Sequence, residues 1–126
     1  MPNTKAIQDL AVGVFPGKPI GGPGTPREMP TTPDPTRTAE DLATQLFGGG
    51  SIDKIPLGPK CIGCWRAQTS DGAWVTYRPA GQASSHTSPT TATVEVNGPR
   101  INAINVKTTG EAEILKLKFP VVSEVP

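Results

Sequence analysis

The single histidine of the chain lies in a loop rich in hydroxyl groups, within the run Ser85-His86-Thr87. Arg78 precedes this loop, and Lys116 lies near the C-terminus. Arginine and lysine bind phosphate and stabilise the charge that develops on its oxygens in a transition state. Serine and threonine hydroxyls can donate to the same oxygens, and an imidazole titrates near neutral pH, so it can carry a proton. Together these residue types predict chemistry on a phosphodiester.

The ribose 2′-OH supplies a nucleophile that belongs to RNA itself, so its attack on the adjacent phosphate needs no metal ion. DNA lacks this group. We therefore predict a metal-independent endoribonuclease with no cofactor. In this hypothesis His86 carries the proton, Arg78 and Lys116 bind the phosphate, and Ser85 or Thr87 orients it.

Each of these residues also has a simpler explanation. A histidine in a polar loop is commonly only solvated, and Arg78 could form a salt bridge with Glu95 or Asp71. Alternating lysines on a final strand are typical of an exposed sheet edge, where they discourage pairing with other chains. The competing hypothesis is a non-enzymatic secreted binding module whose sheet face contacts protein.

The two cysteines form one Cys-x-x-Cys, at Cys61 and Cys64. A structural zinc site needs about four ligands, and only His86 could be added to the pair. A redox motif is expected at the start of a helix, but prolines and glycines precede this pair and a strand-like run follows it. We expect either two buried thiols or a disulfide, and no metal site.

The second half of the chain has the pattern of a β-sheet. Strands are predicted at residues 64–69, 73–78, 90–96 and 114–119, and the Asp-Gly before residue 73 is typical of a hairpin turn. Side chains alternate between the faces of a strand. The side chains expected on outward faces are therefore Arg78, Thr91, Thr93, Glu95, Lys116 and Lys118.

The first half is richer in proline, since ten of the fifteen prolines lie before residue 60. Apolar spacing predicts a helix over 4–14, and a second helix is predicted to begin with Thr38 as its N-cap. Residues 16–35 are interpreted as a linker that buries almost nothing. The predicted organisation is a junction segment at 1–59 and a compact β-rich core at 60–126. The fold class is α+β: short N-terminal helices with a small, twisted antiparallel sheet of three to five strands in the C-terminal half.

The net charge of +1 gives no general argument for nucleic acid, although a local basic cluster is compatible with it. No apolar run approaches the roughly 20 residues of a membrane span. The N-terminus lacks the uninterrupted apolar core of a signal peptide. We therefore expect export by another route, or that the chain is part of a longer protein.

Three stretches carry a family resemblance: DGAWVTYRPAGQASS at 71–85, TATVEVN at 91–97 and LKLKFP at 115–120. Residues 60–120 resemble the C-terminal toxin modules of bacterial polymorphic toxins of the Rhs and contact-dependent inhibition type. Many such modules are similar to the barnase, EndoU, colicin and RelE group of ribonucleases, in which helices precede a four-stranded antiparallel sheet that bears the site.

The resemblance implies candidate catalytic residues at Arg78, Ser85, His86, Thr87 and Lys116. It also implies delivery into a neighbouring cell, action on RNA (tRNA among the targets) in that cell's cytoplasm, and a cognate immunity protein that blocks the site.

A second resemblance stays open. Arg78 followed by Glu111 and Glu113 resembles the order of motifs in ADP-ribosyltransferases. No Ser-Thr-Ser is present, and the spacing from Arg78 to Glu113 is short for that fold.

Overall fold

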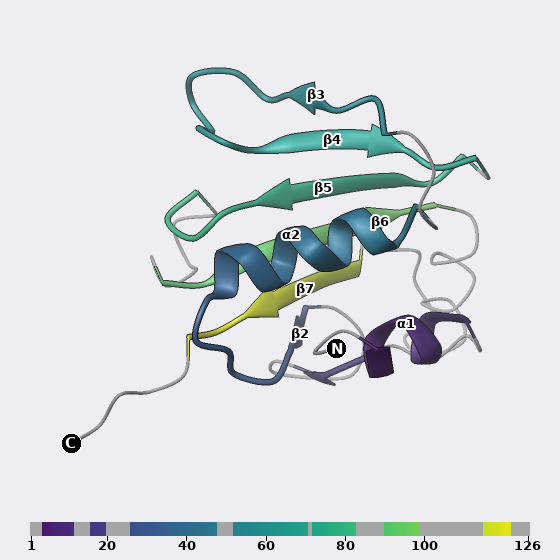
Figure 1. Ribbon diagram of the computed structural model, residues 1–126, viewed down its shortest axis with the longest axis vertical. Helices are drawn as coiled ribbons and strands as arrows, with labels where there is room; N and C mark the ends of the chain where they lie inside the picture. The colour runs from purple at the N-terminus through teal and green to yellow at the C-terminus, as the bar shows by residue number, and fades with distance from the viewer. Residues whose placement is uncertain are drawn as a thin grey trace.

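The computed structural model describes residues 4–11, 16–19, 26–47, 52–70, 72–82, 90–98 and 115–121. These residues form two helices and one sheet of seven strands in the order β1-β2-β7-β6-β5-β4-β3 (Figure 1). The bounds are α1 Thr4–Ala11, β1 Lys18–Pro19, β2 Arg27–Glu28, α2 Pro35–Gln45, β3 Ile55–Pro56, β4 Trp65–Gln68, β5 Trp74–Arg78, β6 Ala92–Asn97 and β7 Leu115–Phe119. The predicted α+β class is confirmed.

The four longest strands, β4 to β7, lie side by side in chain order, and each pairs antiparallel with the next. The short strands β1, β2 and β3 lie outside them in the sheet. A tight turn joins β4 to β5, as the Asp-Gly signal predicts. Thr69 closes this turn, because its backbone N–H donates to the carbonyl of Ala73 at 2.8 Å and its hydroxyl accepts from the N–H of Ala73 at 3.0 Å. Gly72 has φ +90°, a conformation that glycine adopts without steric cost.

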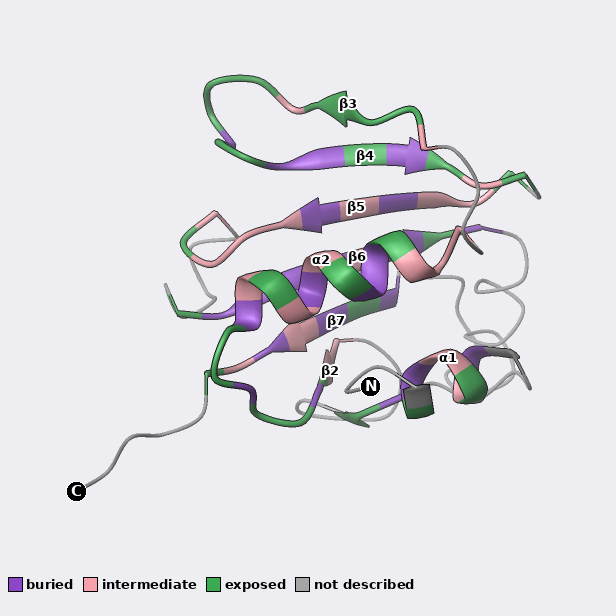
Figure 2. Cartoon of the chain, in the orientation of Figure 1, coloured by how far each residue is buried: buried purple, intermediate pink, exposed green. Residues whose placement is uncertain are grey.

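One face of these strands is apolar and is covered by α2 (Figure 1). Burial alternates along β4 and β5, as Figure 2 shows, so every second side chain faces the helix. Ala39, Leu42 and Ala43 of α2 are fully buried against this face. The largest fully buried side chains of the described sheet are Phe119, Leu115, Leu117, Val75 and Val94.

The start of α2 differs from the prediction. Asp34 is the N-cap, and its side chain accepts a hydrogen bond from the N–H of Arg37 at 3.1 Å. Pro35 occupies the first helical position, where a missing N–H costs nothing. Thr38 lies inside the helix, where its hydroxyl is 2.8 Å from that of Thr32. The predicted cap at Thr38 is therefore wrong.

Polar contacts fix α2 over the sheet. The Tyr77 hydroxyl of β5 donates to the carbonyl of Thr36 at 3.4 Å, and the Trp65 indole of β4 donates to Glu40 at 3.2 Å. Burial, followed by the charges of Glu40 and Asp34, raises the pKa of Tyr77 to about 12, so this hydroxyl stays a donor at neutral pH. The N-terminal half of α2 is thereby tied to the end of β5.

The linker interpretation of residues 16–35 is wrong for the described part of that segment. β1 and β2 lie in it and extend the sheet beyond β7, and Met29 is only 5% exposed. Arg27 holds the segment by donating to the carbonyls of Pro16 at 3.0 Å and Gly17 at 2.7 Å. Because β2 pairs parallel with β7, the sheet is mixed, and it has more than the predicted three to five strands.

The first predicted helix is confirmed over its described part, and residues 12–14 of the prediction lie outside the described residues. α1 covers Thr4–Ala11, and its Ala6 and Leu10 belong to the buried core, whereas Val14 lies outside the described residues. Among the described helices, none is both long and apolar enough to cross a membrane.

Candidate functional site

The face of the sheet opposite α2 carries charged and polar side chains. They alternate with the core residues along β4 to β7, and we call them the charged face: Arg66, Gln68, Trp74, Thr76, Arg78, Thr93, Glu95, Asn97, Lys116 and Lys118. Four of these strand positions are cationic and one is anionic. Although the whole chain is almost neutral, this face therefore has a local excess of positive charge.

Strand register orders the charged face into rows. Arg78 of β5, Thr93 of β6 and Lys118 of β7 are direct Cα partners across three strands. In the next row, Glu95 of β6 lies opposite Lys116 of β7. The guanidinium of Arg78 is therefore in the same row as Lys118 and one row away from Lys116.

Two side-chain contacts hold Arg78 on the charged face. Its Nε lies 3.6 Å from Oε1 of Glu95, and its Nη1 donates to Sγ of Cys61 at 3.3 Å. The Arg78 and Glu95 side chains are 31% and 22% exposed, so water screens their ion pair in part. An arginine has five N–H donors, and these two contacts engage two of them. Of the two carboxylates considered for Arg78, Glu95 is the one in contact, and Asp71 lies outside the described residues.

The structure brings only some of the predicted site residues together. Arg78 and Lys116 lie on the same face, two strands apart. Ser85, His86 and Thr87 lie outside the described residues, as do Glu111 and Glu113.

The loop that carries the single histidine leaves the sheet next to Arg78. Arg78 is the last residue of β5, a turn follows it from Pro79 to Gln82, and the described chain resumes at Thr90 just before β6. Both ends of the loop 83–89 are thus attached at the end of the sheet where Arg78 and Thr93 pair.

Sequence reasoning placed Thr93 and Lys118 on the outward face but assigned neither to the site. The alternation of β6 and β7 was sufficient to find that face. The row they share with Arg78 depends on strand register, which the alternation does not give.

A disulfide joins Cys61 to Cys64 in the loop between β3 and β4, one of the two outcomes expected. This loop packs against the turn after β5: the N–H of Ile62 donates to Oε1 of Gln82 at 3.1 Å, and Cys61 receives the contact from Arg78. Both cysteines line a cavity of about 480 Å³ together with Lys54, Pro56, Gly58, Pro59, Ile62, Gly63 and Trp65. Among the described residues, no group of three or more His, Cys, Asp or Glu side chains is placed to hold a metal ion.

Removing the disulfide is expected to destabilise the protein modestly. The bond closes a loop of only four residues, for which the chain-entropy model gives about 2 kcal/mol. Urea unfolding of the double variant Cys61→Ser/Cys64→Ser should show this loss in the free energy of unfolding. Dithiothreitol should lower the stability of the parent but not of the variant. Equal stability of the parent and the variant in the absence of dithiothreitol would contradict the prediction.

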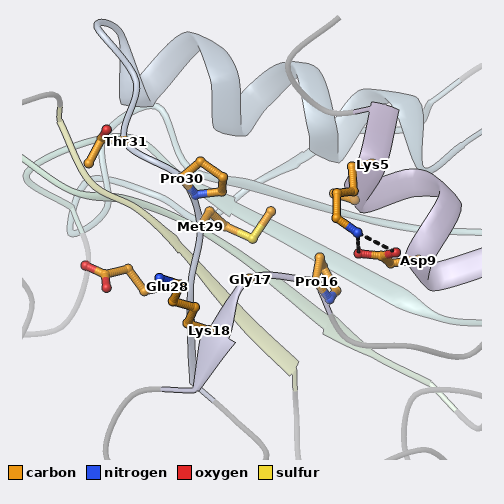
Figure 3. A pocket seen from close by; sticks show the side chains of 10 residues that line it. Lys5, Asp9, Pro16, Gly17, Lys18, Glu28, Met29, Pro30 and Thr31 are labelled. Carbon is orange, nitrogen blue, oxygen red and sulfur yellow. Dashed lines mark hydrogen bonds and ion pairs between the residues drawn. The ribbon is translucent and has the colours of Figure 1, made fainter.

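A second cavity, of about 550 Å³, lies between α1 and the strands β1 and β2 (Figure 3). Its rim carries the ion pair of Lys5 with Asp9 at 3.3 Å, and Pro16 and Met29 contribute apolar surface. Its described lining contains none of the predicted site residues. The charged face, and not this cavity, is therefore the candidate site.

No family model, no curated protein and no solved structure matches the chain.

Proposed function

We propose that this protein is a metal-independent endoribonuclease of the interbacterial toxin kind, which acts on RNA in the cytoplasm of a target cell and is blocked by an immunity protein. The observation that carries the proposal is the charged face itself. Arg66, Arg78, Lys116 and Lys118 lie on one face of an antiparallel sheet, with Glu95 as the only carboxylate among its strand positions. Such a face suits the phosphates of RNA, which dominate the affinity of nucleic-acid binding.

The described residues on either side of the segment that carries His86 favour cleavage over simple binding. Gln82 ends the turn that follows Arg78, and Thr90 comes just before β6, whose Thr93 pairs with Arg78. In the proposed reaction, His86 accepts the proton of a ribose 2′-OH as its oxygen bonds to phosphorus and the bond to the 5′-oxygen breaks. The 5′-oxygen takes a proton from solvent water as it leaves, and the other product carries a 2′,3′-cyclic phosphate. Arg78 and the lysines stabilise the charge on the phosphate oxygens, and Ser85 or Thr87 orients them.

Incubation of the pure protein with total RNA, with and without EDTA, tests this proposal. We expect discrete fragments that are equally abundant with the chelator and that end in a cyclic phosphate. RNA with 2′-O-methyl sugars should stay intact, because it lacks the free nucleophile. Loss of cleavage in EDTA would contradict the metal-independent mechanism.

The same experiment separates the alternatives. Intact RNA with consumption of NAD would favour an ADP-ribosyltransferase. If both RNA and NAD stay intact, the protein is better explained as a binding module.

A further inference from the structure

Thr93 has an unusual environment for a hydroxyl group. It is 3% exposed, and its Oγ1 is buried without a hydrogen-bond partner, the one such side-chain atom among the described residues. Folded proteins pair nearly all buried polar groups, because an unpaired one retains its full desolvation cost. Valine has nearly the same shape and suits a strand equally well, without that cost. The hydroxyl at this position therefore needs an explanation other than packing.

The neighbours of Thr93 indicate what would pair with it. Its Cα partners are Arg78 on β5 and Lys118 on β7, and the side chains of all three belong to the charged face. A hydroxyl can donate or accept, whereas guanidinium and ammonium groups only donate. A ligand that meets all three groups must offer several acceptor oxygens, and the two flanking cations favour one with negative charge.

We propose that Thr93, Arg78 and Lys118 form a phosphate-binding subsite that holds an RNA phosphate on the charged face. This inference rests on the proposed ribonuclease function and adds two residues to its site. The hydroxyl of Thr93 donates to one phosphate oxygen. Arg78 donates through the N–H groups that do not contact Glu95 or Cys61, and Lys118 contributes an ammonium group.

The spacing of the strands suits this arrangement. Neighbouring strands lie about 4.8 Å apart, so the backbones of Arg78 and Lys118 are about 10 Å from each other, with Thr93 midway. Both flanking side chains are long enough to converge over the threonine. Because Oγ1 of Thr93 is buried in this structure, the side chains around it must rearrange for a phosphate oxygen to reach it. Glu95, 3.6 Å from Nε of Arg78, keeps the guanidinium at this end of the sheet.

Thr93→Val tests the subsite, because it removes the hydroxyl and keeps the shape. The probe is a short RNA with 2′-O-methyl sugars, which binds but cannot be cut, and a cleavable RNA of the same sequence reports the rate. Because the variant loses a hydrogen bond to a charged group, it should bind the probe about tenfold or more weakly than the parent does. Thr93→Ser should restore much of the affinity. Thr76→Val, on the same face in the neighbouring row, is the matched control and should bind as the parent does.

Thermal unfolding distinguishes a ligand contact from a structural role. Since Thr93→Val removes an unpaired buried hydroxyl, its unfolding midpoint should stay equal or rise while binding falls. Parent-like binding by Thr93→Val, or an equal loss in Thr76→Val, would overturn the subsite. If Thr93→Val lowers the midpoint, Lys118→Gln decides instead: weaker binding supports the subsite and unchanged binding overturns it.

The subsite and the ribonuclease can fail separately. If the parent binds the probe in a Thr93-dependent way but leaves cleavable RNA intact, the subsite stands and the ribonuclease proposal falls. If the parent cuts RNA and Thr93→Val binds and cuts equally well, the ribonuclease stands and the subsite falls.

Discussion

Replacing Arg78 with alanine is expected to reduce the rate of RNA cleavage by about 10²- to 10³-fold, the usual effect of removing one preorganised group that stabilises transition-state charge. Arg78 is the cation at the junction of the charged face and the histidine loop, and Glu95 and Cys61 hold it there. The substitution also leaves the Glu95 carboxylate without its partner beside the phosphate. Single-turnover cleavage of a defined RNA measures the effect.

Two variants show whether the effect is specific to Arg78. Arg66→Ala removes a guanidinium from the same face, where it lies 4.9 Å from the Trp74 ring, and should reduce the rate only a few-fold. Arg78→Lys keeps the charge but loses the planar fork, so an intermediate rate is expected. The double variant Arg78→Ala/Glu95→Gln should remain slow, because it removes the repulsion without replacing the donor. Equal rates for Arg78→Ala and Arg66→Ala would mean that the face acts only through its total charge.

The central sheet was predictable because its pattern is local. Val75 and Tyr77 alternate with Thr76 and Arg78, and this alternation alone assigns the faces of β5. Gly72 marks the turn for the same reason, since a tight hairpin needs a residue that tolerates positive φ.

The edge strands were not predictable, because they have no local pattern. β1, β2 and β3 contain two residues each, and two of them include a proline, Pro19 and Pro56. Their conformation depends on contacts with distant parts of the chain, such as the pairing of Arg27 with Leu117. Tertiary pairing of this kind overrides the loop signals of proline and glycine.

The sequence predicted which side chains share a face of the sheet, but not which of them lie in the same row across the strands. Alternation assigns Thr93, Lys116 and Lys118 to the charged face, yet only the register shows that Lys118 is in the row of Arg78. The missing partner of the Thr93 hydroxyl depends on burial, which follows from the packing of the whole domain. Sequence reasoning therefore selected Lys116, which lies opposite Glu95.

Replacing His86 with alanine is expected to reduce cleavage by about 10²- to 10⁴-fold, the range for losing a positioned general acid or base. His86 is the only histidine of the chain, so no other imidazole can substitute for it. As a base it must be neutral, so the rate of the parent should rise with pH as the imidazole loses its proton.

Initial rates from pH 5 to 8 measure this effect, and the rise should disappear in His86→Ala. The variant should still bind the 2′-O-methyl RNA as the parent does, because His86 moves a proton whereas Arg78, Thr93 and Lys118 hold the phosphate. This separates proton transfer from binding on one protein. Parent-like rates with the same pH profile in the variant would show that another group carries the proton.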